Sequence, residues 1–211
     1  MISQEIISAL QKRYAVRTFD GSKKVSNEDL NTILESGRLS PSSFGFEPWK
    51  FIVVTNPEIR EKMSVAGYGQ TKITDASHLI VIAYRTDADK LASELVERTA
   101  ITRDKTKEEL SAFQKMAEGA INNRQGDAKE AWLKAQTYIP LGIMIETASI
   151  LGIDNCPMEG FDSEQINTIL GLKEKNLSVT TILAIGYRGD DAYVNMPKVR
   201  RSYNEVVETI S

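Results

Sequence analysis

The apolar positions of this chain follow two spacings, and each spacing predicts one kind of element. Short apolar runs that are rich in β-branched residues and bounded by turn residues are typical of buried strands. Three such runs are KFIVVTN at 50–56, SHLIVIAYRT at 77–86 and SVTTILAIGYRG at 178–189. Elsewhere the apolar residues recur three or four positions apart, which is the spacing of amphipathic helices. The helices expected on this basis cover residues 3–13, 27–39, 56–67, 136–153 and 163–172.

Three residues give signals for helix ends or breaks. Ser3 and Asn27 belong to the residue types that cap helix N-termini, so we expect them to be the N-caps of the first two helices. Pro140 falls within the apolar helix 136–153. Because proline lacks the backbone N–H that continues a helix, we expect the helix to begin or kink there.

Two charged segments differ from the rest of the chain. Residues 87–135 show helical periodicity but few core-sized apolar runs, which predicts a mobile helical lid. Residues 190–211 form a tail with a basic cluster and then a short strand-like or helical end.

The alternation of helices with short buried strands predicts an α+β fold in which the second and last strands are central. The chain has 211 residues, of which 41% are hydrophobic and 26% charged, which is enough for one substantial core. Repeats, linkers and low-complexity segments do not divide it. We therefore expect a single domain over 1–211.

Composition excludes several classes of function. A net charge of -3 gives no global basic field, so a nucleic-acid partner is not expected. One cysteine and one histidine allow neither an internal disulfide nor a zinc site of the Cys/His type, and no metal is expected. The start of the chain lacks a signal-peptide pattern, and no apolar run approaches 18 residues. We expect a cytoplasmic protein without a membrane partner.

Two segments near the N-terminus carry more polar groups than packing requires. KRYAVRTFD places Arg13 and Arg17 four residues apart at the end of a helix, where they could bind an anion or simply complement the helix dipole. SPSSFGFEPWKF brings Ser42 and Ser43 beside Trp49 and a strand. This loop could hydrogen-bond a polar ligand, or it could be a plain turn with a core tryptophan.

Two later segments are similarly rich in polar groups. GYGQTKITDASH offers the amide of Gln70 and the cation of Lys72 shortly before a buried strand. CPMEGFD predicts a rigid apolar turn between Pro157 and Gly160. The tail MPKVRRS adds a second cationic cluster, formed by Lys198, Arg200 and Arg201.

Taken together and in this order, these segments resemble the nitroreductase family over essentially the whole chain. The matching elements are Arg13 and Arg17 followed by Phe19-Asp20, PSS and PW between 41 and 49, Lys72 with DASH at 75–78, PMEGF at 157–161, and PKVR at 197–200. The resemblance implies a nitroreductase-like fold with a central mixed or antiparallel sheet surrounded by helices. It also implies an intertwined homodimer, completed by the tail 190–211.

The resemblance implies an FMN-dependent enzyme that passes hydride from NADH or NADPH, through flavin N5, to a nitroaromatic or quinone acceptor in a ping-pong mechanism. Arg13, Lys198 and Arg200 would hold the FMN phosphate. Arg17 and Lys72 would face the N1 and O2 edge of the ring, where charge develops on reduction. The other cofactor-binding residues implied are Tyr14, Ala15, Pro41, Ser42, Ser43, Gln70, Pro157, Met158, Glu159 and Gly160.

The flavin would carry the chemistry, so no side chain is expected to be a catalytic nucleophile or an obligatory acid. A backbone N–H of Glu159 or Gly160 would point at N5. Pro41, Ser42 and Ser43 would cover the FMN of the other subunit, with Trp49 anchoring their loop to the strand.

The chain departs from the usual family pattern at several positions, which are Gly45, Phe46 and Glu47 in the loop and Gly69 before Lys72. Other reductases of the same fold, such as enoate reductases, a non-enzymatic FMN-binding protein and a cofactor-free interaction module are the alternatives. Three aromatic residues could line a substrate channel or pack in the core, namely Phe113, Trp132 and Tyr138. His78 and Cys156 are expected to be structural.

Overall fold

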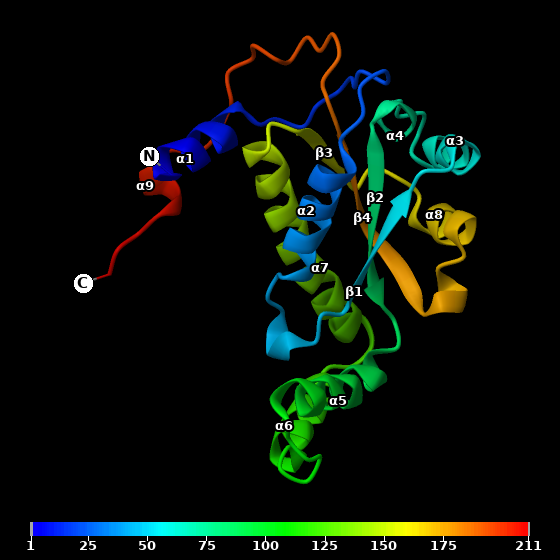
Figure 1. Ribbon diagram of the computed structural model, residues 1–211, viewed down its shortest axis with the longest axis vertical. Helices are drawn as coiled ribbons and strands as arrows, with labels where there is room; N and C mark the ends of the chain where they lie inside the picture. The colour runs from blue at the N-terminus through cyan, green and yellow to red at the C-terminus, as the bar shows by residue number, and fades with distance from the viewer. Residues whose placement is uncertain (1, 211) are drawn as a thin grey trace.

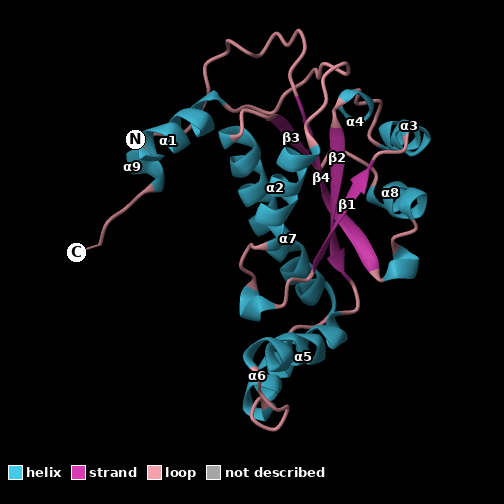
Figure 2. Cartoon of the chain, in the orientation of Figure 1, coloured by secondary structure: helices cyan, strands magenta, loops and turns pink. Residues whose placement is uncertain are grey.

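The computed structural model describes residues 2–210. Helices surround one sheet on both of its faces, which confirms the α+β prediction (Figures 1 and 2). The α-helices are α1 Ile2–Lys12, α2 Asn27–Arg38, α3 Pro57–Ala66, α4 Lys72–Asp75, α5 Leu91–Arg103, α6 Ser111–Asn122, α7 Gly126–Ile150, α8 Ser163–Leu170 and α9 Tyr203–Val206. The strands are β1 Trp49–Val54, β2 His78–Arg85, β3 Asp154–Met158 and β4 Leu177–Gly186.

Within the described residues the sheet has the order β1-β2-β4-β3, and each neighbouring pair is antiparallel. The prediction that the second and last apolar runs are central is confirmed, since β2 and β4 occupy the middle. An irregularity in the β2–β4 register leaves Thr180 without a partner opposite Ile82 and Ala83. It explains why Val179 and Ile182, three residues apart, pack on the same face.

Alternate side chains of the strands belong to two different cores, as the pleat of a sheet requires. On one face Ile80 and Ile82 pack with Ile33 of α2 and Met144 of α7. On the other face the core contains residues from α3, α4 and α8, and it also takes in Cys156 and Met158 of β3.

Pro157 and Met158, which the sequence predicts to be part of a turn that extends to Gly160, instead belong to the edge strand β3. Pro157 sits inside it and pairs with Leu183. Proline is tolerated in a strand when the strand lies at the edge of a sheet, because no outer neighbour needs its missing N–H. The turn begins only at Glu159.

Neither predicted N-cap occupies the cap position of its helix. Ser26, not Asn27, caps α2: its Oγ accepts a hydrogen bond of 3.0 Å from the N–H of Asp29. Ser3 lies inside α1, whose first described residue is Ile2. Serine at position 26 precedes the first helical residue with extended backbone, which is the geometry that lets a side chain reach the free N–H groups.

The helix α7 begins at Gly126, ten residues before the expected 136, and contains Pro140 in its buried interior. Because α7 is one continuous helix, it connects the end of the segment 87–135 directly to the core. The rest of that segment folds as α5 and α6, which project beyond one end of the sheet (Figure 1). Its helical character is confirmed, whereas its role as a lid stays a prediction.

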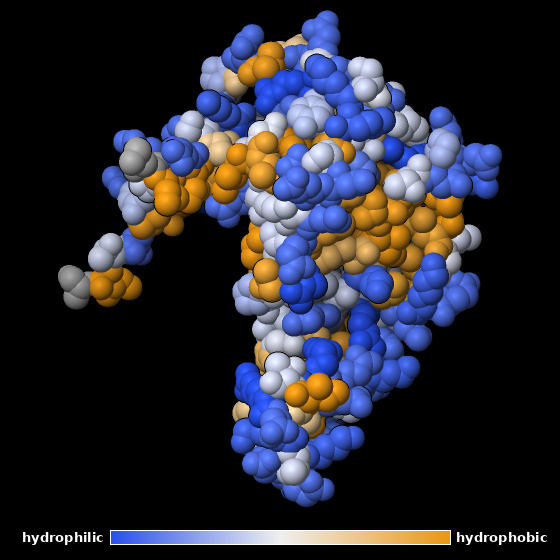
Figure 3. Space-filling view, viewed as in Figure 1, coloured by the Kyte–Doolittle hydropathy of each residue, from blue (hydrophilic) through white to orange (hydrophobic). Residues whose placement is uncertain are grey.

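An arm made by the two chain ends projects from the body of the molecule and carries α1 and α9 (Figure 1). α1 buries none of its described residues, although Ile2, Ile7 and Leu10 are apolar. Figure 3 shows hydrophobic residues gathered on this arm. No helix within residues 2–210 combines the length and apolarity needed to cross a bilayer.

Candidate functional site

The two ends of the chain meet in a cleft of about 520 Å³. Residues 11–15 and Arg17 line it from the end of α1 and the segment that follows, and residues from the tail close it from the other side. Those tail residues include Lys198 and Arg200. The structure therefore brings together two cationic motifs that lie almost 190 positions apart in the sequence, as predicted from the resemblance.

Backbone pairing holds the N-terminal wall of this cleft against the sheet. Ala15 forms a parallel bridge with Asn155 of β3, and the N–H of Val16 donates to the carbonyl of Asn155 at 3.3 Å. Val16 is fully buried, whereas its neighbours Ala15 and Arg17 are exposed. The buried side chain of Val16 therefore anchors the segment, while the side chain of Arg17 is turned outward.

Asp191 fastens the tail to the same wall, a role that we did not predict from the sequence. Its carboxylate accepts hydrogen bonds from the backbone N–H groups of Arg17 at 2.7 Å, Thr18 at 3.2 Å and Tyr193 at 2.9 Å. Burial opposes its ionisation, but the N–H donors of Tyr193, Arg17 and Thr18 leave the pKa of Asp191 below its usual value. An aspartate that bonds the N–H two residues ahead is a common turn signal.

Three cations in the cleft repel one another. Burial and then the charge of Arg200 lower the pKa of Arg13. Burial, Arg13 and Arg200 lower the pKa of Lys198 in the same way. Among residues 2–210 these three side chains make no salt bridge, and the side-chain hydrogen bonds of Lys198 and Arg200 go only to the main-chain carbonyls of Leu10 and Val199. Such a set of donors fits an anion that carries more than one charge.

Arg17, which lines the cleft, and Lys72, which lies outside it, are both close to Cys156 of β3. Burial raises the pKa of the Cys156 thiol, while Lys72, Arg17 and Arg13 lower it, which places all three cations around this sulfur. Cys156 is 3% exposed and belongs to the core. Arg17 also lies over the ring of Tyr193, at 5.0 Å from its centroid. The positive field of the cleft thus continues along the edge of the sheet to α4.

The turn after β3 is held from two sides. Gln70 donates from Nε2 to the carbonyl of Gly160 at 2.6 Å and to that of Gly67 at 2.9 Å. Tyr138 of α7 donates from its hydroxyl to a carboxylate oxygen of Glu159 at 2.8 Å. Both hydrogens of the Gln70 amide are therefore used within the protein, and only its carbonyl oxygen is left to contact a ligand.

The PSS loop lies at the opposite end of the α2–α7 pair from the segment 13–17 (Figure 1). The N–H of Ser43 donates to Gln136 of α7 at 2.7 Å, and the hydroxyl of Ser42 accepts from the N–H of Glu47 at 2.8 Å. Pro41 precedes them and is exposed. Within one chain the loop therefore does not join the cationic cleft.

Phe46, rather than Trp49, anchors this loop. Phe46 is 1% exposed and packs edge to face on Trp132 with centroids 5.9 Å apart. Trp49 is half-buried and stacks on Phe51 of the same strand. The glycine at position 45 has a φ of +78°, a conformation that favours glycine, so this departure from the family pattern suits the local backbone.

Four further residues that the sequence made conspicuous lie away from the cleft. Phe113 and Trp132 pack against the core that joins α5, α6 and α7. His78 is half-buried beside the hydroxyl of Ser77, and its pKa is lowered by burial, Arg60 and Lys24. Arg201 does not line the cleft. The described residues contain no group of three or more His, Cys, Asp or Glu side chains placed to bind a metal.

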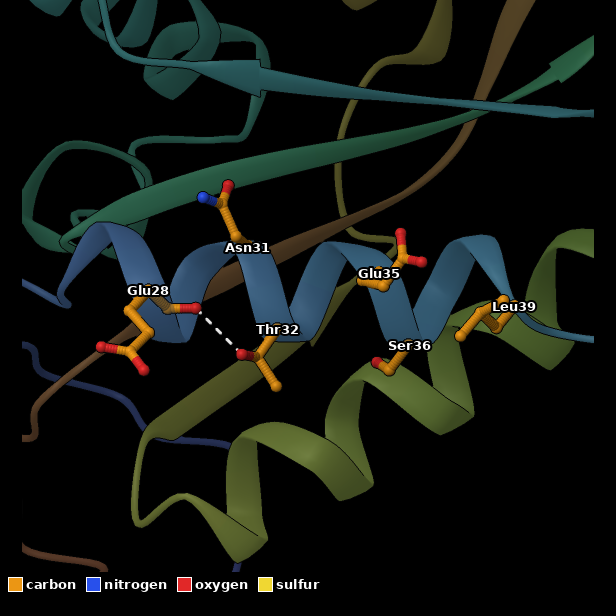
Figure 4. A pocket seen from close by; sticks show the side chains of 6 residues that line it. All are labelled: Glu28, Asn31, Thr32, Glu35, Ser36 and Leu39. Atoms are coloured by element: carbon orange, nitrogen blue, oxygen red, sulfur yellow. Dashed lines mark hydrogen bonds between the residues drawn. The ribbon is translucent and has the colours of Figure 1, made fainter.

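A larger hollow of about 730 Å³ lies along the outer side of α2 (Figure 4). The residues that line it all come from α2 and its last turn, and they are Glu28, Asn31, Thr32, Glu35, Ser36 and Leu39. The hydroxyl of Thr32 bonds the carbonyl of Glu28 within the helix. Among residues 2–210 no cation and no second helix or strand lines this hollow, so it is a helix surface rather than a reactive site.

The architecture and the cleft together define an α+β protein with a cationic cleft formed by both chain ends. The sequence model of the Nitroreductase family matches residues 10–187. A Staphylococcus aureus (strain bovine RF122 / ET3-1) protein, named as an NAD(P)H nitroreductase, is 38% identical over 221 aligned residues that cover 99% of this chain and 97% of that protein. The chain belongs to the nitroreductase family.

Solved structures share the same fold. The nitroreductase ydfN of Bacillus subtilis superposes with a TM-score of 0.88 at 24% identity. The superposition covers 99% of this chain and 100% of the ydfN chain. A nitroreductase of Exiguobacterium sibiricum 255-15, solved in complex with FMN, gives a TM-score of 0.80 at 23% identity, covering 98% of this chain and 96% of its own. The predicted nitroreductase-like fold is confirmed.

Proposed function

We propose that this protein is an FMN-dependent oxidoreductase that passes hydride from NADH or NADPH to a nitroaromatic or quinone acceptor. The observation that carries the proposal is the convergence of Arg13, Lys198 and Arg200 in one cleft without an anionic partner among the described residues. A phosphate monoester is dianionic near neutral pH and takes such forked, charge-assisted donors. The names of relatives as NAD(P)H nitroreductases and the FMN bound to the Exiguobacterium protein support the same assignment.

The remaining residues of the site fit the other parts of FMN. Arg17 and Lys72 supply positive charge along the sheet edge beyond the phosphate cleft, where they would stabilise negative charge on the pyrimidine edge of the ring. Tyr14, Ala15 and the segment Pro157–Gly160 would form the wall on which the ring lies. When bound, FMN supplies the hydride chemistry, so the chain contributes position, charge and exclusion of water.

The same proposal includes a homodimer with composite sites. The PSS loop lies far from the cleft of its own chain and would cover that of a second copy. α7 exposes a stripe of small and apolar residues in helical spacing, namely Ala131, Ala135, Ile139, Gly142 and Ile150. β1 has β2 on one side and no strand on the other within the described residues. An unpaired edge accepts an added strand from another chain.

Residues 207–210, which follow α9 in the tail, are the candidates for that added strand. Val207 has extended backbone, with φ -126° and ψ 124°. Val206 and Ile210 are 55% and 91% exposed. Apolar side chains at such exposure indicate a segment that is completed by a partner. The tail of each chain would thus pair with β1 of the other.

The test of the proposed activity is a steady-state assay on flavin-loaded protein. We expect NAD(P)H oxidation to be stimulated by a nitroaromatic or a quinone and less by an enone. The purified protein should be yellow and release FMN on acid denaturation. A colourless protein that cannot be loaded with FMN would instead favour a cofactor-free interaction module. Loading without turnover of any acceptor would favour a flavin-binding protein.

Replacing Lys72 by methionine is expected to make bound flavin harder to reduce, because it removes a positive charge and keeps the length of the side chain. The expected loss of charge stabilisation is about 1 to 3 kcal/mol, or a fall of about 20 to 60 mV in a two-electron midpoint potential. Redox titration of the bound flavin measures it. Lys12→Met removes a charge from the phosphate end of the cleft and serves as the control. An unchanged potential in the Lys72 variant would show that this cation does not face the ring.

The affinity for FMN is expected to fall at alkaline pH because of Lys198. Its pKa is already lowered in the free protein, and a bound phosphate would raise it again. Affinity is therefore constant while the lysine is protonated in both states, and it declines as pH rises through the pKa of the free protein. Fluorescence titration of FMN at several pH values follows the decline. Lys198→Met should bind more weakly and lose this dependence; an identical pH profile in the variant would refute the assignment.

A further inference from the structure

The turn that follows β3 carries two main-chain donors that the protein leaves unused. Among residues 2–210 the N–H groups of Glu159 and Gly160 donate no hydrogen bond, and both residues are exposed. The chain on either side is fixed. Met158 pairs with Ile182 in the sheet, and the N–H of Asp162 donates to the carbonyl of Ala66 at 2.9 Å. The turn is thus a short exposed span between two anchored ends.

Two side chains from distant parts of the fold hold this span. Tyr138 reaches it from α7 and bonds the carboxylate of Glu159, at a sequence separation of 21. Gln70 reaches it from the loop before α4 and bonds the carbonyl of Gly160, at a sequence separation of 90. The Gln70 amide is itself fixed by its second bond to Gly67. The turn is therefore held from both sides, by α7 through Tyr138 and by the loop before α4 through Gln70.

We propose that Tyr138 and Gln70 are positioning residues that clamp the Glu159–Gly160 turn, so that its two free N–H groups point at the reactive edge of the bound ring. The proposal rests on the proposed function, because it assigns those donors to flavin. Glu159 has two roles in this arrangement. Its carboxylate accepts the hydrogen bond from Tyr138, while its main-chain N–H faces the ligand.

The clamp matters because hydrogen-bond donors act on a reacting atom only when their direction is fixed in advance. An exposed turn with a glycine would otherwise sample several backbone conformations. Burial and the neighbouring carboxylate raise the pKa of Tyr138 to about 12, so its hydroxyl remains a donor across the pH range of any assay.

Hydrogen–deuterium exchange of the full chain tests the clamp directly. Tyr138→Phe and Gln70→Ala are each expected to raise the exchange rate of the Phe161 and Asp162 amides, which donate to the carbonyls of Glu159 and Ala66, by about tenfold or more, as local opening becomes easier. Amides of β4 should be unchanged. Glu159→Gln keeps an oxygen that accepts the tyrosine hydroxyl and should retain most of the protection. Tyr203→Phe, at an exposed tyrosine of α9, is the matched control.

The flavin-loaded protein gives a second readout. Tyr138→Phe should slow hydride transfer from NAD(P)H in stopped-flow measurements by about tenfold, with FMN affinity within twofold of the parent protein. Tyr138→Phe combined with Glu159→Ala should be no worse than the poorer single variant, because both remove the same bond. A merely structural tyrosine would weaken FMN binding and hydride transfer together.

The outcomes separate this proposal from the proposed function. Exchange can be measured without cofactor, so a protein that fails to bind FMN would refute the proposed function and still reveal whether the turn is clamped. If FMN binds and is reduced, but exchange and hydride transfer in Tyr138→Phe match the parent protein, the clamp is refuted and the proposed function stands.

Discussion

Replacing Arg13 and Arg200 together by alanine is expected to abolish FMN binding at micromolar concentration. The two guanidinium groups approach the same cleft from opposite ends of the chain, and the charge of Arg200 lowers the pKa of Arg13. A hydrogen bond to a charged group contributes about 1.5 to 3 kcal/mol, so losing one at each residue costs about 3 to 6 kcal/mol, or a hundredfold to ten-thousandfold in affinity. Fluorescence titration of FMN into cofactor-free protein measures the loss.

Arg201→Ala supplies a matched control for this experiment. Arg201 lies next to Arg200 in the tail but does not line the cleft, so its removal changes net charge without removing a phosphate ligand. The single variants Arg13→Ala and Arg200→Ala should each fall between the control and the double variant. The phosphate assignment fails if the double variant binds FMN as tightly as Arg201→Ala does.

Replacing Val207 by proline is expected to convert the protein into flavin-poor monomers. The φ of Val207 is -126°, far from the value near -65° that proline imposes, and the substitution also removes the N–H that donates to the carbonyl of Tyr203 at the end of α9. Interfaces of obligate dimers bury above about 2,000 Å², so a chain that loses its partner exposes much apolar surface. Because a ligand shared by two subunits stabilises only the assembled state, flavin and dimer should be lost together.

Light scattering at sub-micromolar concentration, together with the ratio of flavin to protein, measures both losses. Glu208→Ala alters the neighbouring residue without changing backbone freedom and should remain dimeric and yellow. Ile139→Glu tests the α7 stripe independently. Ile139 is a cleaner choice than Ile145, which packs partly against the core beneath α7. A proline variant that stays dimeric with full flavin would show that the tail does not complete the partner's sheet.

The sequence predicted the parts of the fold that depend on strong hydrophobic patterns. β2 is an almost continuous run of buried apolar residues, which is why a central position could be predicted for it. β3 was missed, because Asn155 and Pro157 are turn-forming residues that an edge strand tolerates. The start of α7 was misplaced, because its first turns belong to the polar helical segment and only its later turns are apolar.

The residues of the candidate site also fall into a group that the sequence predicted and a group that it missed. Arg13, Arg17, Lys72, Lys198 and Arg200 were predicted as a group, because their spacing matches a family pattern. Asp191 and the contact between Tyr138 and Glu159 were not, since each depends on backbone directions and on long-range packing that no local pattern encodes. The roles assigned to individual residues toward FMN stay predictions.

The measurement that tests the central claim most directly is anaerobic addition of NADH or NADPH to the FMN-loaded protein. The account predicts that the visible absorbance of the oxidised flavin disappears with at least one of the two nicotinamides, and that a quinone added afterwards restores it, with about one FMN reacting per chain. Flavin that stays oxidised in the presence of both nicotinamides would contradict the proposal that this protein is an NAD(P)H-dependent reductase.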